Sequence, residues 1–422
     1  MLQAALTDGT AGRRCAFSVF ARALPPGRRY GVVAGAGRLL EELERFRFDD
    51  ADLDYLRSAG IVSGTTCEWL ASYRFAGDID GYAEGEPCFP HSPILVVTGT
   101  FAECVLLETL VLSILNHDTA IASAAARMVC AAGDRPCIEM GSRRTHEQAA
   151  VAAARAAHLV GFSSTSNLAA GRRYGLRTTG TSAHAFTLLH DRERDAFRAQ
   201  VSALGGGTTL LVDTYDVAEA VRIAVEVAGP QLGAVRLDSG DLPGLAQQVR
   251  KQLDSLGADG TRIVVTSDLD EHAIAALATA PVDAYGVGTS VVTGSGHPTA
   301  GLVYKLVARA VTEEPDAPLL PVEKRSPGKA SIGGRPYAVR RHGAGSRGGT
   351  AVAEVVVTGG PPSARADERP LQVPLVRGGE VVGPSSVVEA QEHHRRAMAA
   401  LPPHAMQLSR GEAALPTLFE RA

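Results

Sequence analysis

Four short apolar segments between residues 210 and 288 constrain the fold more than any other feature of the chain. They begin at Leu210, Ala234, Arg262 and Asp283, so each starts 21 to 28 residues after the one before. That spacing suits one strand followed by one helix. The runs are continuously apolar rather than alternating, which is typical of parallel strands covered on both faces. The pattern therefore predicts an α/β fold with a parallel sheet.

Helix signals accompany these segments. Asp216 and Asp268 each stand three residues before a glutamate, the pattern in which a side chain caps the first turn of a helix. Two further apolar, Ala-rich stretches, residues 103–116 and 119–132, predict two helices.

The two ends of the chain differ from this middle region. Residues 78–93 are rich in Gly and Pro, and the βα pattern breaks down after about residue 310. The C-terminal tail lacks the apolar runs for a large core of its own, so we expect it to pack against the N-terminal segment. The expected division is an N-terminal part at 1–97, a βα domain at 98–309 and a C-terminal part at 310–422.

Composition excludes several classes of protein. The chain has 422 residues, 45% of them hydrophobic and 21% charged, which is ordinary for a soluble enzyme. With 42 basic against 46 acidic residues, it predicts neither a nucleic acid nor a membrane as partner. Its six cysteines form no CxxC pair, which indicates a reducing cytoplasm and no metal or disulfide framework.

Polar residues and glycines follow six of the expected strands. In a βα barrel, the carboxyl ends of the strands face the active site. Any one of the Asp and Ser residues among them could instead cap a helix. Their recurrence at the same end of successive strands predicts one shared site. The residues are Arg143, Thr165, His184, Asp213, Arg236, Asp238, Ser267, Asp268, Gly286, Gly288 and Thr289.

A phosphate site is predicted at two of these strand ends. Residues 286–290 (GVGTS) offer backbone N–H groups and hydroxyls after a strand, and residues 267–268 could complete the same cup. A plain tight turn would use the same glycines. No GxxxxGK[ST] loop occurs in the chain and no full GxGxxG occurs within residues 98–309, so neither a P-loop nor a dinucleotide fold is indicated for the βα region.

Three basic positions could carry binding or chemistry. The Arg236 guanidinium could hold a carboxylate in a bidentate grip, or form a salt bridge with Asp238 or Asp241. The Arg143-Arg144 pair could neutralise a polyphosphate, or be a solvated charge pair. The imidazole of His184 could act as a base or nucleophile, or be a hydrogen-bonded structural histidine.

Taken together, these segments resemble the bacterial nicotinate phosphoribosyltransferases over nearly the whole chain. The matching segments are 17–25 (FSVFARALP), 116–119 (NHDT), 142–144 (SRR), 165–167 (TSN), 180–186 (GTSAHAF), those around Asp213 and Arg236, and 304–307 (YKLV). The resemblance implies a type II phosphoribosyltransferase, with an irregular α/β (TIM-like) barrel and an α/β sandwich built from both chain ends.

The resemblance also implies a reaction. Nicotinate condenses with 5-phosphoribosyl 1-pyrophosphate to give nicotinate mononucleotide and pyrophosphate, coupled to ATP hydrolysis, in the salvage route to NAD. An enzyme of this kind belongs to the ATP-hydrolysing ligases. A cytoplasmic homodimer with active sites near its interface and Mg²⁺ as cofactor are implied as well.

Residue roles are carried over by motif. His184 matches the histidine that takes a phosphoryl group from ATP, and Arg236 matches the residue that faces nicotinate. Asp213 and Asp238 match carboxylates near the ribose and Mg²⁺, and Arg143 matches a residue near the pyrophosphate. The other implied substrate-binding residues are Thr165, Ser267, Asp268, Gly286, Gly288 and Thr289.

The sequence departs from the family pattern in three places. Relatives begin with Leu-Thr-Asp-x-Tyr-x-Leu-Thr-Met, and Met1 aligns with that final Met. Either the start was assigned too late, or the protein lacks a tyrosine that in relatives reaches the nicotinate ring across a dimer interface. Ala185 and Met140 stand where relatives often have Ser and Phe, so ring stacking at Met140 is not expected from the pattern.

Two alternatives stay open. The first is a nicotinamide phosphoribosyltransferase, because an amide can also sit over a guanidinium. The second is a folded but inactive subunit that acts only as a dimer partner. A type I phosphoribosyltransferase is disfavoured, because no apolar strand ends in the paired acids and Thr-Gly-x-Thr turn of that class.

Overall fold

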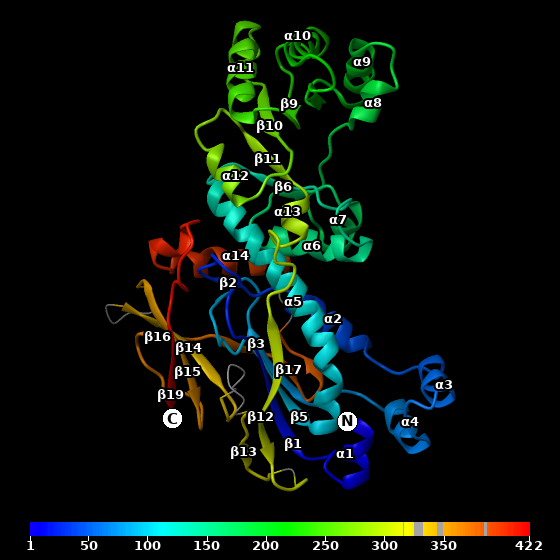
Figure 1. Cartoon of the computed structure of the whole chain (residues 1–422), viewed down its shortest axis with the longest axis vertical. Coiled ribbons are helices and arrows are strands. Elements are labelled where there is room, and N and C mark those ends of the chain that lie inside the picture. The colour runs from blue at the N-terminus through cyan, green and yellow to red at the C-terminus, as the bar shows by residue number, and fades with distance from the viewer. Residues whose placement is uncertain (315, 325–331, 344–348, 384–385) are drawn as a thin grey trace. The chain divides into compact units, whose positions relative to one another are not determined.

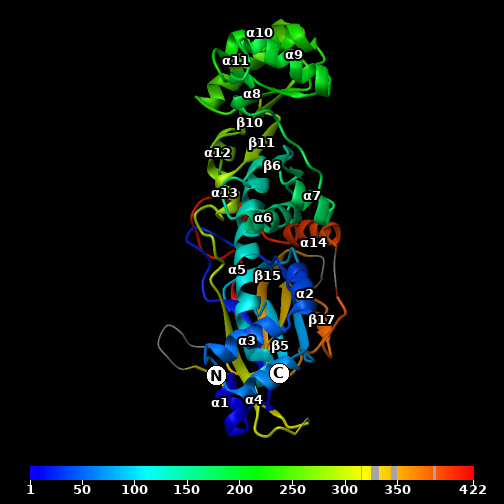
Figure 2. The same cartoon turned by 90° about the vertical axis from the view of Figure 1, so that its right-hand side faces the viewer.

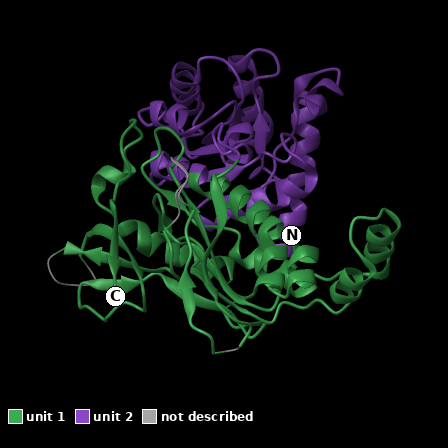
Figure 3. Cartoon of the chain, turned by 60° about the horizontal axis from the view of Figure 1, so that its bottom comes forward, with its two compact units in different colours: residues 1–123, 299–422 green, residues 124–298 purple. Residues whose placement is uncertain are grey.

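The computed structural model describes residues 1–314, 316–324, 332–343, 349–383 and 386–422. They form two compact units, shown in different colours in Figure 3. Unit 1 contains residues 1–123 and 299–422, and unit 2 contains residues 124–298. The boundaries therefore lie at 123/124 and 298/299, rather than at the expected 97/98 and 309/310.

A seven-stranded sheet in unit 1 explains the second shift of boundary. Its order is β13-β12-β1-β5-β3-β17-β18, in which β1 pairs antiparallel with both β5 and β12. Strand β12 therefore belongs with the N-terminal segment and not with the βα region. The strands are β1 (Arg14–Ala21), β3 (Asp78–Tyr82), β5 (Leu95–Thr100), β12 (Leu302–Ala310), β13 (Leu319–Pro321), β17 (Gln372–Arg377) and β18 (Glu380–Val381).

The C-terminal part of the chain also forms a four-stranded sheet in unit 1 (Figure 1). Its order is β16-β14-β15-β19, and a short pair, β2 with β4, lies apart from it. The strands are β14 (Tyr337–His342), β15 (Ala351–Thr358), β16 (Glu368–Pro370), β19 (Thr417–Arg421), β2 (Gly31–Val32) and β4 (Pro87–Cys88). The helices of unit 1 alone are α1 (Leu2–Asp8), α2 (Ala36–Arg45), α3 (Asp50–Ser58), α4 (Gly64–Ala71) and α14 (Val387–Ala399).

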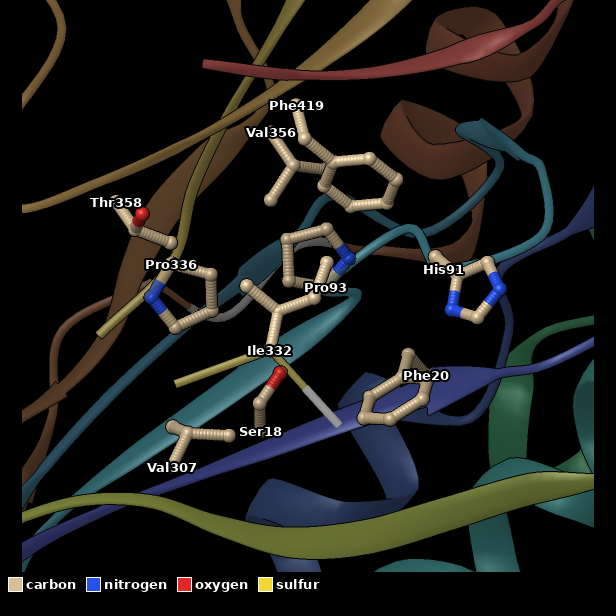
Figure 4. Close-up of a pocket in the computed structure, with 10 residues that line it drawn as sticks. All are labelled: Ser18, Phe20, His91, Pro93, Val307, Ile332, Pro336, Val356, Thr358 and Phe419. Carbon is tan, nitrogen blue, oxygen red and sulfur yellow. The ribbon is translucent and has the colours of Figure 1, made fainter. Parts of the chain in front are cut away.

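A small apolar pocket of about 30 Å³ lies in unit 1 (Figure 4). Side chains from both larger sheets line it, among them Phe20 of β1, Val307 of β12 and Phe419 of β19. A space of this size holds about one or two water molecules. It is therefore too small for a substrate.

Helix α5 (Phe101–Ala132) is the long cyan helix in Figure 2. Two helices were predicted here, and that prediction was wrong, because the intervening His117-Asp118 contains no helix breaker. Among the described helices, α5 alone is long and apolar enough to cross a membrane by length and composition. Leu107, Val111 and Ile121 are fully buried, however, as in a core helix.

The sheet of unit 2 confirms the predicted parallel βα pattern. Its order is β7-β6-β11-β10-β9-β8, and every neighbouring pair is parallel. The expected TIM-like barrel is not confirmed, because these six strands form an open sheet with β7 and β8 at its edges. The strands are β6 (Cys137–Glu139), β7 (Ser164–Thr165), β8 (Thr209–Leu211), β9 (Ala234–Leu237), β10 (Arg262–Val265) and β11 (Ala284–Val287).

The helices of unit 2 follow these strands. They are α6 (Glu147–Leu159), α7 (Leu168–Tyr174), α8 (His184–Leu188), α9 (Glu193–Leu204), α10 (Val217–Ala228), α11 (Leu242–Ser255), α12 (Glu271–Ala276) and α13 (Thr289–Val292). Asp216 caps α10 as predicted, by accepting a hydrogen bond from the Glu219 amide. Asp270, rather than Asp268, caps α12. Asp268 is therefore not used as a helix cap.

Candidate active site

A cavity of about 230 Å³ lies at the carboxyl ends of strands β6, β9, β10 and β11 in unit 2. Eight of the eleven residues expected at the site line it, all except Thr165, His184 and Asp213. The lining residues are Met140, Arg143, Arg144, Arg236, Asp238, Thr266, Ser267, Asp268, Gly286, Gly288 and Thr289. The parallel topology thus brings together residues that are far apart in the sequence, as expected for strand ends.

Arg236 projects from β9 and is held by hydrogen bonds at all three guanidinium nitrogens. Nε donates to the Thr266 hydroxyl at 2.8 Å, Nη1 to the Thr181 hydroxyl at 2.7 Å and Nη2 to Asp238 Oδ1 at 2.8 Å. The salt bridge to Asp238 that the sequence left open therefore forms. Only 11% of the Arg236 side chain is exposed. The guanidinium is fixed in position before any substrate arrives.

Asp238 closes this arrangement. Its Oδ1 also accepts a hydrogen bond from the Thr266 hydroxyl, so Arg236, Asp238 and Thr266 form a closed triangle. Burial acts to raise the pKa of Asp238, but the hydrogen bonds from Thr266 and Arg236 and the nearby positive charges outweigh it. The net pKa is lowered, and the carboxyl is ionised at neutral pH.

The sequence analysis missed Thr266 and Thr181. Thr266 follows β10 directly, at the end of an apolar run, and its hydroxyl is the last polar group before the predicted phosphate cup. That position was the available signal. Thr181 lies in the segment that leads to His184, and no local pattern connects it with Arg236.

His184 and Asp213 form a second pair beside this triangle. His184 Nε2 lies 3.1 Å from Asp213 Oδ1, and Asp213 Oδ2 accepts from the Asp238 amide at 3.0 Å and the Ser239 hydroxyl at 2.8 Å. The Asp213 side chain is 3% exposed, whereas that of His184 is 40% exposed. A buried carboxylate thus orients an imidazole whose other face is open to solvent.

Glycines and a strained serine shape the opposite wall of the cavity. A Cβ on Gly286 would lie 2.4 Å from Thr266 Cγ2 and 2.8 Å from Met140 Sδ, so a larger residue does not fit there. Ser267 has a φ of 120°, a conformation that side chains other than glycine rarely adopt. Strain of this kind clusters at ligand sites, where the surrounding structure holds it in place.

Two protein-family models match the sequence of this chain. Residues 1–116 match the nicotinate phosphoribosyltransferase N-terminal domain, and residues 136–315 match the nicotinate phosphoribosyltransferase family. The chain belongs to the nicotinate phosphoribosyltransferase family. Because the two matches together cover most of the chain, the membership holds for both compact units.

Individual relatives point the same way. The chain is 59% identical to "Nicotinate phosphoribosyltransferase pncB1" of Mycobacterium tuberculosis (strain ATCC 25618 / H37Rv), over 99% of this chain and 92% of that protein. It is 38% identical to "Nicotinate phosphoribosyltransferase" of Bacillus subtilis (strain 168), over 71% of this chain and 63% of that protein. The crystal structure of human nicotinic acid phosphoribosyltransferase superposes with a TM-score of 0.85 at 25% identity, covering 100% of this chain and 96% of that one.

Two arginines of this family member form a positively charged rim of the cavity. Arg143 and Arg144 are exposed, and neither forms an ion pair with another described residue. The Arg144 amide donates to the Gly141 carbonyl at 2.8 Å, so the pair sits on a tight turn directly after β6. Of the two interpretations that the sequence allowed, the position on the cavity favours an anion-binding pair.

Thr165 occupies a different place from the other expected site residues. It is 1% exposed, and it does not line the cavity. Its hydroxyl donates to Glu139 and accepts from the Asn167 amide at 2.9 Å. Thr165 therefore contacts Glu139 and Asn167 behind the cavity wall, and it does not face the cavity itself.

The expected Mg²⁺ site can be tested on the oxygen atoms present. Magnesium is usually bound through one or two carboxylates together with substrate phosphates. Both oxygens of Asp213 already accept hydrogen bonds, and no group of three or more potential metal-binding side chains occurs among the described residues. Asp238 Oδ2, in contrast, accepts none from the described part of the chain. These oxygen atoms fit a magnesium ion that is held by Asp238 and substrate oxygens. Asp213 would then orient His184 and the Asp238 backbone rather than bind the metal.

Proposed function

We propose that this protein condenses nicotinate with 5-phosphoribosyl 1-pyrophosphate to give nicotinate mononucleotide and pyrophosphate, in the salvage of NAD. One observation carries the proposal. In a member of this family, a fixed guanidinium, an ionised carboxylate, a glycine-lined cup and a pair of unpaired arginines all face one cavity. These groups match the charges of the two substrates.

The cavity offers each part of the substrates a suitable partner. The 5′-phosphate fits the Ser267-Asp268 and Gly286–Thr289 segments, because Ser267, Asp268 and Thr289 are exposed and the two glycines have no side chain to block the cavity. The pyrophosphate fits the rim formed by Arg143 and Arg144. The nicotinate carboxylate faces Arg236, which has five N–H bonds and uses three of them at 2.7–2.8 Å. Nη1 also makes a long contact of 3.5 Å with the Ser182 carbonyl oxygen, which a carboxylate can replace, so one N–H on each terminal nitrogen can take the carboxylate.

The reaction passes through a ribosyl cation as pyrophosphate leaves. Asp238, ionised and fixed by Arg236 and Thr266, can stabilise positive charge that develops on the ribose. A magnesium ion bound by Asp238 and substrate oxygens would supply charge neutralisation to the leaving pyrophosphate. Asp213 keeps the Asp238 backbone in place through its hydrogen bond with that amide.

We further propose that His184 is phosphorylated by ATP. If Nε2–H donates to Asp213, the lone pair of the neutral imidazole lies on Nδ1, which has no hydrogen bond with a described residue. Nδ1 attacks the γ-phosphorus of ATP, an N–P bond forms, and ADP leaves with the electrons of the broken P–O bond. Water later cleaves the N–P bond and releases phosphate. The exposed face of His184 leaves room for this step.

The test is mononucleotide formation from labelled nicotinate and phosphoribosyl pyrophosphate, with Mg²⁺, in the presence and absence of ATP. The wild type should form product faster with ATP, and His184→Ala should keep a basal rate while losing the response to ATP. An ATP response that survives in His184→Ala would rule out the phosphohistidine. No product from nicotinate under any of these conditions would rule out the activity.

The same assay with labelled nicotinamide tests the second candidate substrate. An amide lacks the negative charge that Arg236 can neutralise, so we expect nicotinate to be preferred. Faster turnover of nicotinamide would reverse this assignment. We also propose a cytoplasmic homodimer, for which light scattering on the purified protein gives the oligomeric state directly.

A further inference from the structure

We infer that Glu139 is a positioning residue for the anion-binding arginines. Its buried carboxylate, together with the Thr165 hydroxyl, holds the turn that carries Arg143 and Arg144 at the edge of the cavity. This inference rests on the proposed function only for the identity of the anion.

Glu139 is the last residue of β6, and its side chain is completely buried. A buried carboxylate is costly unless donors satisfy its oxygens. Here each oxygen has one: the Gly141 amide donates to Oε1 at 2.5 Å, and the Thr165 hydroxyl donates to Oε2 at 2.5 Å. The carboxylate therefore bridges the ends of two neighbouring strands, β6 and β7.

A closed circuit of hydrogen bonds continues from this bridge. The Thr165 hydroxyl accepts from the Asn167 amide at 2.9 Å, and Asn167 Nδ2 donates to the Ser142 hydroxyl at 3.0 Å. Ser142 lies between Gly141 and the two arginines, so the circuit returns to the turn where it began. The loop after β6 and the loop after β7 are thus connected to one another and to the Glu139 carboxylate.

The turn itself has no room to shift. A Cβ on Gly141 would lie 2.2 Å from Val292 Cγ1 of α13 and 2.9 Å from the Gly288 carbonyl oxygen. The arginine turn therefore packs directly against the glycine segment of the cavity. Any movement of Gly141 would displace Arg143 and Arg144 relative to the rest of the binding wall.

The test measures the binding of inorganic pyrophosphate to the full-length protein by calorimetry. Glu139→Leu removes both acceptors while keeping a similar volume, and should raise the Kd about 10- to 100-fold, as for other residues that orient ligand-binding groups. In an Arg143→Ala/Arg144→Ala background, Glu139→Leu should change the Kd little, because the carboxylate acts through those arginines. An effect of equal size in both backgrounds would overturn the inference.

Milder variants keep the test valid if Glu139→Leu does not fold. Glu139→Gln retains an acceptor for the Gly141 amide and can donate to Thr165, so it should rescue most of the binding. Thr165→Val removes the second support and should weaken binding more than Glu139→Gln does. The reverse order would contradict the proposed circuit.

A matched control is available in the same unit. Glu193 of α9 is also buried, at 8% exposure, but it does not line the cavity. Glu193→Leu should leave pyrophosphate binding unchanged even if it lowers the melting temperature. A Kd for Glu139→Leu no higher than that of Glu193→Leu would mean that the residue is merely structural.

Pyrophosphate binding does not depend on turnover, so the two proposals can fail separately. Suppose that the wild type binds pyrophosphate but makes no mononucleotide, and that Glu139→Leu loses the binding. That result would overturn the proposed function and leave the positioning role intact. A folded wild type that does not bind pyrophosphate would overturn the positioning role itself.

Discussion

Two clusters of charged and polar side chains in this protein use similar residues for different ends. The buried ion cluster of unit 1 consists of Glu86, Arg340 and Glu354, each with a side chain 0–1% exposed. The site cluster of unit 2 consists of Arg236, Asp238 and Thr266, and it borders a cavity. The first is closed to solvent on every side, while the second has one open face. Exposure, rather than residue type, separates a structural ion pair from a candidate site.

The buried ion cluster joins distant parts of the chain. Arg340 of β14 lies 2.9 Å from Glu354 of β15 and 3.5 Å from Glu86, and Tyr82 of β3 donates to Glu354 at 2.7 Å. Arg369 and His393 add further contacts to Glu86, at 2.8 Å and 2.7 Å. The cluster therefore holds the N-terminal segment against strands from the C-terminal end.

The most severe test of the comparison is Arg340→Leu. It leaves Glu86 and Glu354 buried without their shared partner, which typically costs about 3–5 kcal/mol of stability. Denaturant unfolding followed by circular dichroism measures the loss. Arg222→Leu, which removes an exposed ion-pairing arginine on α10, should have no measurable effect. A similar loss in both variants would show that burial is not the deciding factor.

Arg236→Lys tests the other cluster. Lysine keeps the charge but cannot donate to Thr266, Thr181 and Asp238 at once. We expect kcat/KM for nicotinate to fall about 100- to 1,000-fold, the range for removing a fixed donor at a reacting centre, with little change in melting temperature. If Arg236→Lys unfolds as readily as Arg340→Leu, the main role of Arg236 is to stabilise the fold, as Arg340 does.

The pH dependence of stability sharpens the contrast. His394 of α14 is buried and contacts the Gly85 carbonyl oxygen at 2.9 Å, and burial lowers its pKa from 6.5 to about 4. The unfolded chain therefore binds a proton as the pH falls below about 6.5 while the folded chain does not. Stability should decline between these two values by up to about 3 kcal/mol, and level off below the lower one.

His394→Asn provides the control for this titration. Asparagine can keep a donor to the Gly85 carbonyl but does not titrate, so the slope between pH 6.5 and 4 should become shallower. Glu86 does not produce the same slope. Burial tends to raise its pKa, but His393, Arg340 and Arg369 hold it at about 2, so its contribution is lost only as the pH falls from about 4.5 towards that value. An unchanged slope in His394→Asn would assign the titration to another group.

The sequence predicted those parts of the fold that depend on local pattern. The apolar runs at β8, β9, β10 and β11 became parallel strands, because burial on both faces leaves a local signature. The pairing of β12 with β1 joins two segments that lie far apart in the sequence, and no local signal marks it. The open edges of the unit 2 sheet were likewise missed, because closure depends on strand partners and not on any single segment.

The candidate site divides in the same way. Arg236 and Asp238 could be found because they stand where an apolar strand ends, and eight of the expected residues line the cavity for that reason. Thr181 and Glu139 could not be found, because their roles depend on hydrogen bonds between strand ends that meet only in three dimensions. Residues that line the cavity leave a pattern in the sequence, while those that support them leave little.

Thr266→Val gives the smallest and most specific prediction. The hydroxyl of this buried residue accepts from Arg236 Nε and donates to Asp238, and valine has nearly the same shape without it. Losing one such bond beside charged groups costs about 1.5–3 kcal/mol, so kcat/KM for nicotinate should fall at least about 10-fold. Thr266→Ser keeps the hydroxyl and should retain most of the activity. A larger loss in Thr266→Ser than in Thr266→Val would mean that packing of the methyl group against Gly286, and not the hydroxyl, matters at this position.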